Sequence, residues 1–321
     1  MRRLGCSGLV AILAAVGVLF WTVRSWGGAG PSTHTITFEV APGASLASTA
    51  QKLEHAGAIR SADRFRLLAR VFGSGEGIKA GEYRLPPHIS AADVLKLVQG
   101  GRTLQRMVVV PEGWASVQVQ DALRDAQGLT GPPPLPPEGS ILPDSYAFER
   151  GATRASVAAR MEKAMRDYLA AAWAKRKPGI AVTTPEQAIV LASIVEKETG
   201  KASERRLVAA VYSNRLRRGM KLQADPTVIY PITHGRPLGR RIRESELQAV
   251  NGYNTYAAIG LPAGPIANPG RASIDAVLDP ADSQALYFVA DGSGGHVFAT
   301  TLDEHNRNVA KWRAYRAAHG T

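Results

Sequence analysis

The sequence predicts an α+β protein with an N-terminal transmembrane helix, a small α+β module and a larger mixed α/β domain that contains a buried helix. Three observations support this prediction. An uncharged, mostly apolar run extends from Leu4 to Val23. Strand-like and helix-like patterns alternate between residues 35 and 101. A later helical stretch, residues 188–195, is apolar on nearly every side, which is typical of a helix enclosed by its domain.

The run from Leu4 to Val23 is long enough to cross a bilayer as a helix. Arg2 and Arg3 precede it and only Arg24 follows closely, so the positive-inside rule predicts residues 1–3 as a cytoplasmic tail, 4–24 as an anchor and the rest outside. A cleaved signal peptide would occupy the same position. The run is longer than the apolar part of a usual signal peptide, however, and no Ala-x-Ala site follows it, which favours the anchor.

Cysteine and charge exclude several classes of protein. The one cysteine, Cys6, lies in the predicted anchor, so the exported part can form neither a disulfide nor a cysteine-based metal site. The seven histidines show no ligand-like spacing, and we expect no metal and no cofactor. A formal charge of +12 could attract nucleic acid, anionic lipid or an acidic polymer. The basic residues are scattered without interleaved aromatics, so we expect no nucleic acid.

The small module is predicted over residues 35–101, after a linker over 25–34 that includes the flexible sequence GGAGP. Its expected elements follow from alternation, capping residues and glycines. They are a strand at 36–40, helices at 47–58 and 62–72, a strand at 81–85 and a helix at 90–99.

The larger domain is predicted over residues 104–321. A proline-dense loop at 131–139 interrupts the first part of this domain, and a glycine-rich turn at 291–295 interrupts its last part. The expected elements are a strand at 107–110, helices at 156–175 and 203–218, a buried strand at 285–290, a pairing strand at 297–299 and a helix at 302–319.

The helix that begins after Thr184 is the most informative element of this domain. Thr184 can cap it, Pro185 suits its first position, and Gln187 completes a capping-box pattern. Its apolar stretch ends at Glu196-Lys197-Glu198. Glu198 lies about 200° around the helix from Glu196, so the two carboxylates should not act as a pair on one face.

Glu196 is the candidate acid/base. A carboxylate at the C-terminal end of a buried helix is disfavoured in its charged form by desolvation and by the helix dipole, as a general acid requires. The alternative is that Glu196 or Glu198 only pairs with Lys197 or a nearby arginine at the end of the helix.

Loops at 222–227, 252–256 and 260–270 are dense in glycine, proline, asparagine and tyrosine. Such loops suit carbohydrate, because tyrosines stack on sugar faces while amides and carboxylates bind hydroxyls. Tight turns explain the same composition equally well. His296 and His305 could serve as bases, although polar histidines at strand edges and helix surfaces are commoner.

An ordered set of motifs from about residue 36 to the C-terminus resembles the MltG/YceG family of endolytic murein transglycosylases. The motifs are PEGW (111–114), LPDSY (142–146), ASIVEKET (192–199), NRL and GMKLQADPTVIY (214–230), YNTY (253–256), GLPAGPIANPG (260–270), LYFVADGSGGHVF (286–298) and HN (305–306). Gly200-Lys201 and an arginine-rich stretch at 231–243 depart from the family pattern. These departures would alter contacts with substrate or partners and leave the catalytic assignment unchanged.

The resemblance implies that Glu196 is catalytic and that the glycan groove is lined by Gln223, Asp225, Tyr253, Asn254 and Asn268. It also implies a LysM-like module at 35–101 and a YceG-type catalytic domain at 104–321, outside the inner membrane in the periplasm. The substrate is then the β-1,4-linked glycan strand of nascent peptidoglycan, cut internally to leave 1,6-anhydro ends, which limits strand elongation. Peptidoglycan synthases are the expected protein partners.

The chemistry of that family suits a single glutamate. A lytic transglycosylase lets the muramic acid 6-hydroxyl attack its own anomeric carbon, so one residue first gives and then takes a proton. Most glycoside hydrolases instead need two carboxylates, and Asp225 would be the second in a murein hydrolase. A non-catalytic wall-binding scaffold is a further alternative. A pyridoxal-phosphate lyase would need a Schiff-base lysine and a phosphate site, and the predicted anchor disfavours it.

Overall fold

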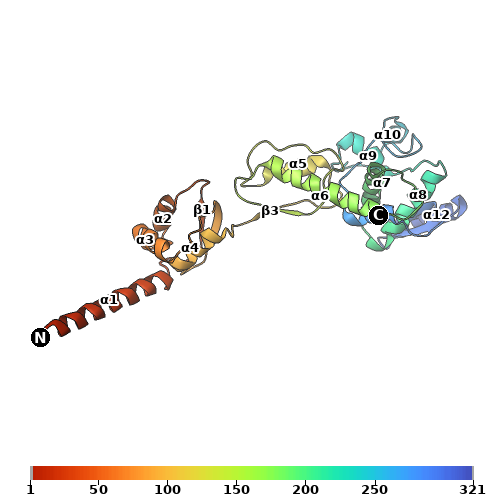
Figure 1. Ribbon diagram of the computed structural model, residues 1–321. Helices are drawn as coiled ribbons and strands as arrows, with labels where there is room; N and C mark the ends of the chain where they lie inside the picture. Colours follow the sequence, from red (N-terminus) through yellow and green to blue (C-terminus); the bar gives the residue numbers. More distant parts are fainter. Residues whose placement is uncertain (1–2, 320–321) are drawn as a thin grey trace. The chain divides into compact units, whose positions relative to one another are not determined.

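The computed structural model describes residues 3–319 and is mixed α+β (Figure 1). The chain divides into two compact units, residues 1–106 and 107–321, which we describe separately. The first unit contains α1 (Arg3–Gly27), β1 (Ile36–Val40), α2 (Leu46–His55), α3 (Ala62–Phe72), β2 (Gly81–Leu85) and α4 (Ala91–Gly100).

Two short strands and three helices enclose the core of the first unit. β1 pairs with β2 in antiparallel register, with Ile36 opposite Leu85. Alternation along β1 buries Phe38 and Val40, and the apolar sides of α2, α3 and α4 join them in one cluster. Each of these helices starts at a serine whose side chain accepts a hydrogen bond from the backbone N–H three residues on, at Ser45, Ser61 and Ser90.

α1 is the one described helix long and apolar enough to span a membrane, with a candidate span at Leu9–Gly27. It continues past the predicted anchor, and Trp26 is buried against Phe65 of α3 at a centroid distance of 5.7 Å. The segment predicted as a linker, 25–34, also contacts this unit. The N–H of Gly30 donates to the carbonyl of His88 at 3.0 Å, and a side chain at Gly30 would collide with the carbonyl of Ile89.

The second unit holds the remaining elements, with β3 (Arg106–Val109) beginning at the boundary between the units. β3 pairs with β4 (Ser145–Phe148), and β5 (Tyr287–Ala290) pairs with β6 (His296–Ala299). The helices are α5 (Ser116–Asp125), α6 (Arg154–Ala174), α7 (Pro185–Glu198), α8 (Arg205–Arg217), α9 (Asp225–Thr233), α10 (Glu244–Gln248), α11 (Arg271–Leu278) and α12 (Leu302–His319).

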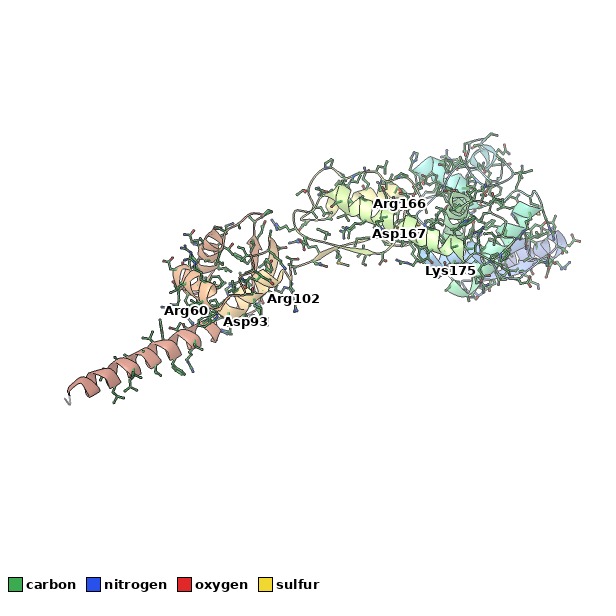
Figure 2. The ribbon with its side chains drawn as sticks, in the orientation of Figure 1. Arg60, Asp93, Arg102, Arg166, Asp167 and Lys175 are labelled. Atoms are coloured by element: carbon green, nitrogen blue, oxygen red, sulfur yellow. The ribbon has the colours of Figure 1, made fainter. Side chains whose placement is uncertain are left out.

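α7 is the central helix of the second unit, and the prediction of a buried helix is confirmed. Every residue from Ala188 to Val195 is buried, in a cluster shared with residues of α6, α8 and α11. Thr184 caps the helix by accepting a hydrogen bond from the N–H of Gln187 at 3.2 Å. α6 covers one side of this core and leaves Arg166, Asp167 and Lys175 on its outer side (Figure 2).

Four helices were not predicted from the sequence, namely α5, α9, α10 and α11. α9 carries Pro231 within it, and α10 and α11 are only five and eight residues long, so none of these three shows a sustained helical pattern. The predicted buried strand at 285–290 needs correction too. β5 is half-buried along its length, with one short partner strand, β6, and contacts to α8 and α12.

Replacing Leu191 by alanine tests the dependence of the second unit on α7. Leu191 has no exposed surface, so Leu191→Ala should lower the free energy of unfolding by about 2–5 kcal/mol. The matched control is Leu302→Ala, at a leucine that is 53% exposed, with an expected loss below about 0.5 kcal/mol. Urea titration of the full-length protein in detergent measures both, and equal losses would contradict a core centred on α7.

Candidate active site

The last turn of α7 carries two glutamates that lie in different surroundings. Glu196 and Glu198 point to opposite sides of the helix and contact different residues, in agreement with their angular separation. The surroundings of each carboxylate decide what chemistry it can perform.

Glu196 joins two loops. Its Oε2 accepts a hydrogen bond from the N–H of Gly270 at 2.9 Å, and its Oε1 lies 3.8 Å from the guanidinium of Arg205. The side chain is only 7% exposed, and its Cγ lies against Gly113. These contacts connect the PEGW loop, α8 and the start of α11, and they occupy the carboxylate with protein partners.

Glu198 lies on the wall of an open cleft of about 440 Å³. α8 contributes Tyr212 and Arg215 to the same wall, and the loop before α9 contributes Gln223. The remaining residues that line the cleft are Leu222, Asp225, Tyr256, Phe288, Val289 and His305. Most of these positions belong to the motifs at 214–230, 253–256, 286–298 and 305–306, so the cleft collects residues that are far apart in the sequence.

Burial raises the pKa of Glu198 to about 7. Tyr212 opposes the shift by donating a hydrogen bond to the carboxylate, the nearby charge of Asp225 adds to it, and Arg215 opposes it. A carboxyl group with this pKa is protonated in an appreciable fraction of molecules near neutral pH, which suits a general acid.

Arg215 is a buried cation that fixes the cleft. Its Nε donates to the carbonyl of Leu286 at 2.7 Å, and one terminal nitrogen donates to the carbonyl of Leu222 at 2.6 Å. The same nitrogen lies 3.4 Å from Oε1 of Gln223. One guanidinium therefore ties α8 to the loop before α9 and to the residue before β5.

The loop before α9 places Gln223 and Asp225 in the cleft. Gln223 adopts a left-handed backbone conformation with φ of 53°, which is strained for a residue other than glycine and is commonest where a side chain has a functional position. Asp225 accepts a hydrogen bond from the hydroxyl of Tyr256 at 2.6 Å. Gln223 and Asp225 are thus the two predicted groove residues that share the cleft with Glu198.

The other predicted groove residues lie elsewhere. Asn254 is buried, and its amide nitrogen donates to three carbonyls at the end of α10, those of Glu246, Leu247 and Ala249. Tyr253 packs against Tyr230 at a centroid distance of 5.0 Å. Neither residue lines the cleft of Glu198, and their assignment to the groove stays a prediction.

Asn268 has no exposed surface and does not line the cleft of Glu198 either. Its Oδ1 accepts from the N–H of Ile141 at 2.9 Å, and its Nδ2 donates to the carbonyl of Trp114 at 3.0 Å. Its backbone also exchanges hydrogen bonds with the 113–114 segment. Asn268 therefore holds the PEGW loop in place.

A second open cleft, of about 510 Å³, adjoins α7 and α9. Lys197 and Pro226 line it, although each is a sequence neighbour of a residue in the first cleft. Trp114 and Tyr230 supply aromatic surface. The arginine-rich stretch at 231–243 also contributes, through residues 235–238, so this departure from the family pattern forms part of a cleft wall.

The two histidines have structural surroundings of different kinds. Nδ1 of His296 lies 2.8 Å from Oε2 of the buried Glu204, which joins the β5–β6 hairpin to the start of α8. His305 stacks on Tyr287 at 5.1 Å and lines the cleft of Glu198. Burial lowers the pKa of His305, with a further contribution from Arg215, which favours a neutral imidazole there.

Sequence patterns do not show which of Glu196 and Glu198 faces a cleft, because both glutamates end the same buried helix. Glu198 follows Leu191 and Ile194 around the helix, whereas Glu196 follows Ile189, Ala192 and Ser193, and all five are buried. Only the tertiary structure shows that the side of Glu198 opens into a cleft. The proximity of Tyr212 and Arg215, one turn apart on the next helix, was the one available signal.

Comparison with known proteins places this arrangement in a family. The model of the YceG-like family matches residues 38–311. A Bacillus subtilis (strain 168) protein named endolytic murein transglycosylase is 27% identical over 88% of this chain and 86% of its own length. A Streptococcus pneumoniae (serotype 2, strain D39) protein of the same name is 28% identical over 87% of this chain, which spans 59% of that relative.

A solved structure agrees with this result. The crystal structure of a YceG-like protein from Listeria monocytogenes has 28% sequence identity and a TM-score of 0.52, over 86% of this chain and 99% of that one. The family match covers both structural units and every element that forms the cleft of Glu198. The chain therefore belongs to the YceG-like family.

Proposed function

We propose that this protein is an endolytic lytic transglycosylase that cleaves murein glycan strands, with Glu198 as the acid/base. The observation that carries the assignment of the residue is a buried glutamate with a pKa of about 7 on the wall of an open cleft. The family and the names of its relatives support the reaction and the substrate.

One carboxyl group suffices for this reaction. Protonated Glu198 gives its proton to the glycosidic oxygen as the bond from that oxygen to the anomeric carbon of the muramyl residue breaks. The muramyl 6-hydroxyl then bonds to the same carbon and gives its proton to the Glu198 carboxylate. The products are a 1,6-anhydro end and a free 4-hydroxyl, and the enzyme returns to its starting protonation state.

The other cleft residues support the proton transfers. Asp225 places negative charge near Glu198, which favours the protonated form of Glu198. The same charge would stabilise the positive charge that develops at the anomeric carbon in the transition state. Tyr212 donates to the Glu198 carboxylate and so orients it. Arg215 holds Gln223 against the cleft, where its amide can bind a sugar hydroxyl.

The role predicted for Glu196 from the sequence is untested, and its contacts favour a structural role. Its Oε2 is engaged by the N–H of Gly270, and it lines neither cleft. We therefore assign to Glu196 the positioning of the PEGW and 268–270 loops, and to Glu198 the chemistry.

The remaining parts of the chain fit an enzyme held at the inner membrane. α1 serves as the single anchor, with residues 1–3 in the cytoplasm and the rest in the periplasm, as the positions of Arg2 and Arg3 favour. Residues 35–101 form a LysM-like module, supported by a separate core of two strands and three helices. Nascent glycan strands are the substrate, and peptidoglycan synthases are the protein partners.

Two matched substitutions test the catalytic residue. Full-length protein with Glu198→Gln should lose activity on purified murein sacculi by at least about 10²-fold, because the amide can give no proton. Glu196→Gln should keep most of the activity once its fold is confirmed by circular dichroism. Mass spectrometry of the released fragments should detect 1,6-anhydromuramyl ends from internal bonds.

Other outcomes would redirect the assignment. Loss of activity with Glu196→Gln alone would restore the prediction from the sequence. Reducing ends in place of anhydro ends would indicate a hydrolase with Asp225 as the second carboxylate, since Asp225 lines the same cleft. No product from folded wild-type protein would leave a wall-binding scaffold.

The pH dependence of kcat/KM tests the protonation state of Glu198. Because the reaction starts from the protonated carboxyl group with a pKa of about 7, kcat/KM should fall about tenfold per pH unit above that value. Asp225→Asn removes a negative charge that raises this pKa, so the fall should begin at lower pH. A profile that is flat over about three pH units around that pKa would contradict the role of Glu198.

A further inference from the structure

α3 presents an exposed surface that combines arginines with apolar side chains. Leu67 and Val71 are 62% and 65% exposed, on the side of α3 opposite the buried Phe65 and Leu68. Arg64 precedes Leu67 by three positions and so lies beside it on the helix. Arg60 is exposed and precedes the first residue of α3 by two positions. We call the set Arg60, Arg64, Leu67 and Val71 the α3 outer face.

This face lies beside the end of α1, within the same compact unit. The Cζ atom of Arg64 is 4.2 Å from the ring centroid of Trp21 in α1. Trp21 precedes the last residue of α1, Gly27, by about 9 Å along the helix axis. Trp26 fixes the arrangement by packing on Phe65 and Phe72. The start of α3 is therefore set back along α1, alongside its last turns.

The length of the apolar run places this contact at the edge of a bilayer. A hydrocarbon core of about 30 Å takes about 20 helical residues. The uncharged run from Leu4 to Val23 has about that length, so Trp21 lies near the boundary, at the level where tryptophans commonly gather. Arg64, stacked on Trp21, is then at the level of the phospholipid headgroups.

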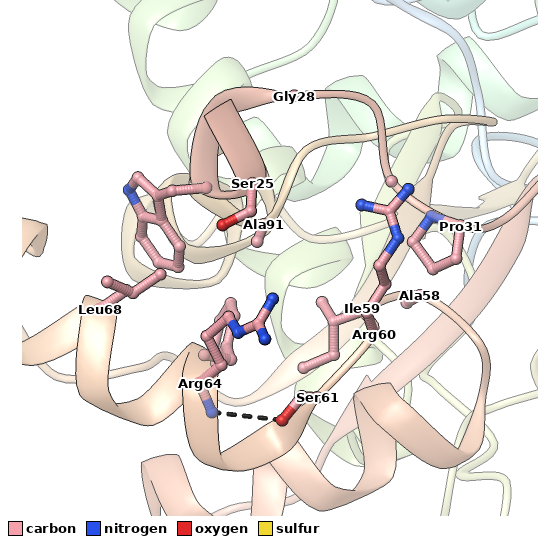
Figure 3. Close-up of a pocket in the computed structure, with 13 residues that line it drawn as sticks. Ser25, Gly28, Pro31, Ala58, Ile59, Arg60, Ser61, Arg64, Leu68 and Ala91 are labelled. Carbon is pink, nitrogen blue, oxygen red and sulfur yellow. Dashed lines mark hydrogen bonds between the residues drawn. The ribbon is translucent and has the colours of Figure 1, made fainter. Parts of the chain in front are cut away.

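Arg60 and Arg64 have charge available for an anion. Figure 3 shows the side chain of Arg64 pointing toward Ser25 at the end of α1, and that of Arg60 pointing toward Gly28 and Pro31. Arg60 and Asp93 both lie near the end of α1 in Figure 2. Within residues 3–319, neither guanidinium forms an ion pair, whereas Asp63 pairs with Arg66 and Asp93 accepts from Ser90.

We propose that the α3 outer face binds the membrane surface, with Arg60 and Arg64 on the phosphates of anionic phospholipids and Leu67 and Val71 in the interfacial layer. Guanidinium groups match phosphate oxygens in geometry and charge, and apolar side chains beside them gain by leaving water. The site is continuous with the anchor, so the lipid is that of the leaflet from which α1 emerges. The inference rests on the proposed membrane insertion of α1.

Fluorescence quenching in vesicles tests this surface with the full-length chain. Cys6→Ala removes the native thiol, and a fluorophore is attached to a single cysteine introduced by Leu67→Cys. Val16→Cys in α1 reports insertion, and Thr37→Cys on the exposed side of β1 reports the solvent-facing side. The vesicles contain phosphatidylcholine with or without phosphatidylglycerol, and lipids with a nitroxide in the headgroup act as quenchers.

Quenching is expected at position 67 and not at 37, and it should be stronger with phosphatidylglycerol. Arg60→Gln and Arg64→Gln should each lower the ratio of quenched to unquenched fluorophore at position 67 about fivefold, the effect of one arginine at an anionic surface. The control Arg84→Gln, an exposed arginine on β2, should leave quenching unchanged.

The outcomes separate the anchor from the headgroup site. The fluorophore at position 16 is tested with lipids that carry the nitroxide on the acyl chain. If these lipids do not quench it, α1 is not inserted, which refutes the anchor itself. With position 16 inserted, absent quenching at 67, or quenching that neither arginine substitution reduces, would overturn the proposed site.

Discussion

The architecture of the second unit depends on burying α7 on every side. A helix without an exposed face must be surrounded, and α6, α8, α9 and α11 do this for the segment Ala188–Val195. Its polar last turn then lies among neighbouring elements rather than in bulk water. The carboxylates there need either protein partners or a cleft, and Glu196 and Glu198 represent these two solutions.

Burial of charge has opposite consequences at these two positions. Glu196 accepts a hydrogen bond from the backbone N–H of Gly270 and lies near Arg205, so it connects loops. Glu198 is desolvated and lies near the negative charge of Asp225, so it holds a proton more tightly, although the hydrogen bond from Tyr212 opposes this. The two carboxylates of one motif therefore lie in different surroundings.

Local sequence signals predicted the elements that begin at a cap and continue for several turns. Thr184 and Ser90 each start a helix as expected, and the alternation at residues 36–40 forms β1. α9 was missed because Asp225 and Pro226 resemble a turn as much as a helix start. Asn254 and Asn268 resemble ligand-binding amides in sequence, but their side chains bond to backbone groups. The partner of Asn254 is a carbonyl of α10, and that of Asn268 is the N–H of Ile141, far away along the chain.

The contact between Trp26 and the core of the first unit makes α1 and this unit move together. Trp26, in the last turn of α1, packs on Phe65 and Phe72. The N–H of Gly30 donates to the carbonyl of His88, so the end of α1 is attached to this unit at two points. A helix adjusts its tilt to the thickness of the surrounding bilayer. With α1 inserted as proposed, such a change of tilt would turn the module as well, so local membrane thickness would become a variable that sets the orientation of the module.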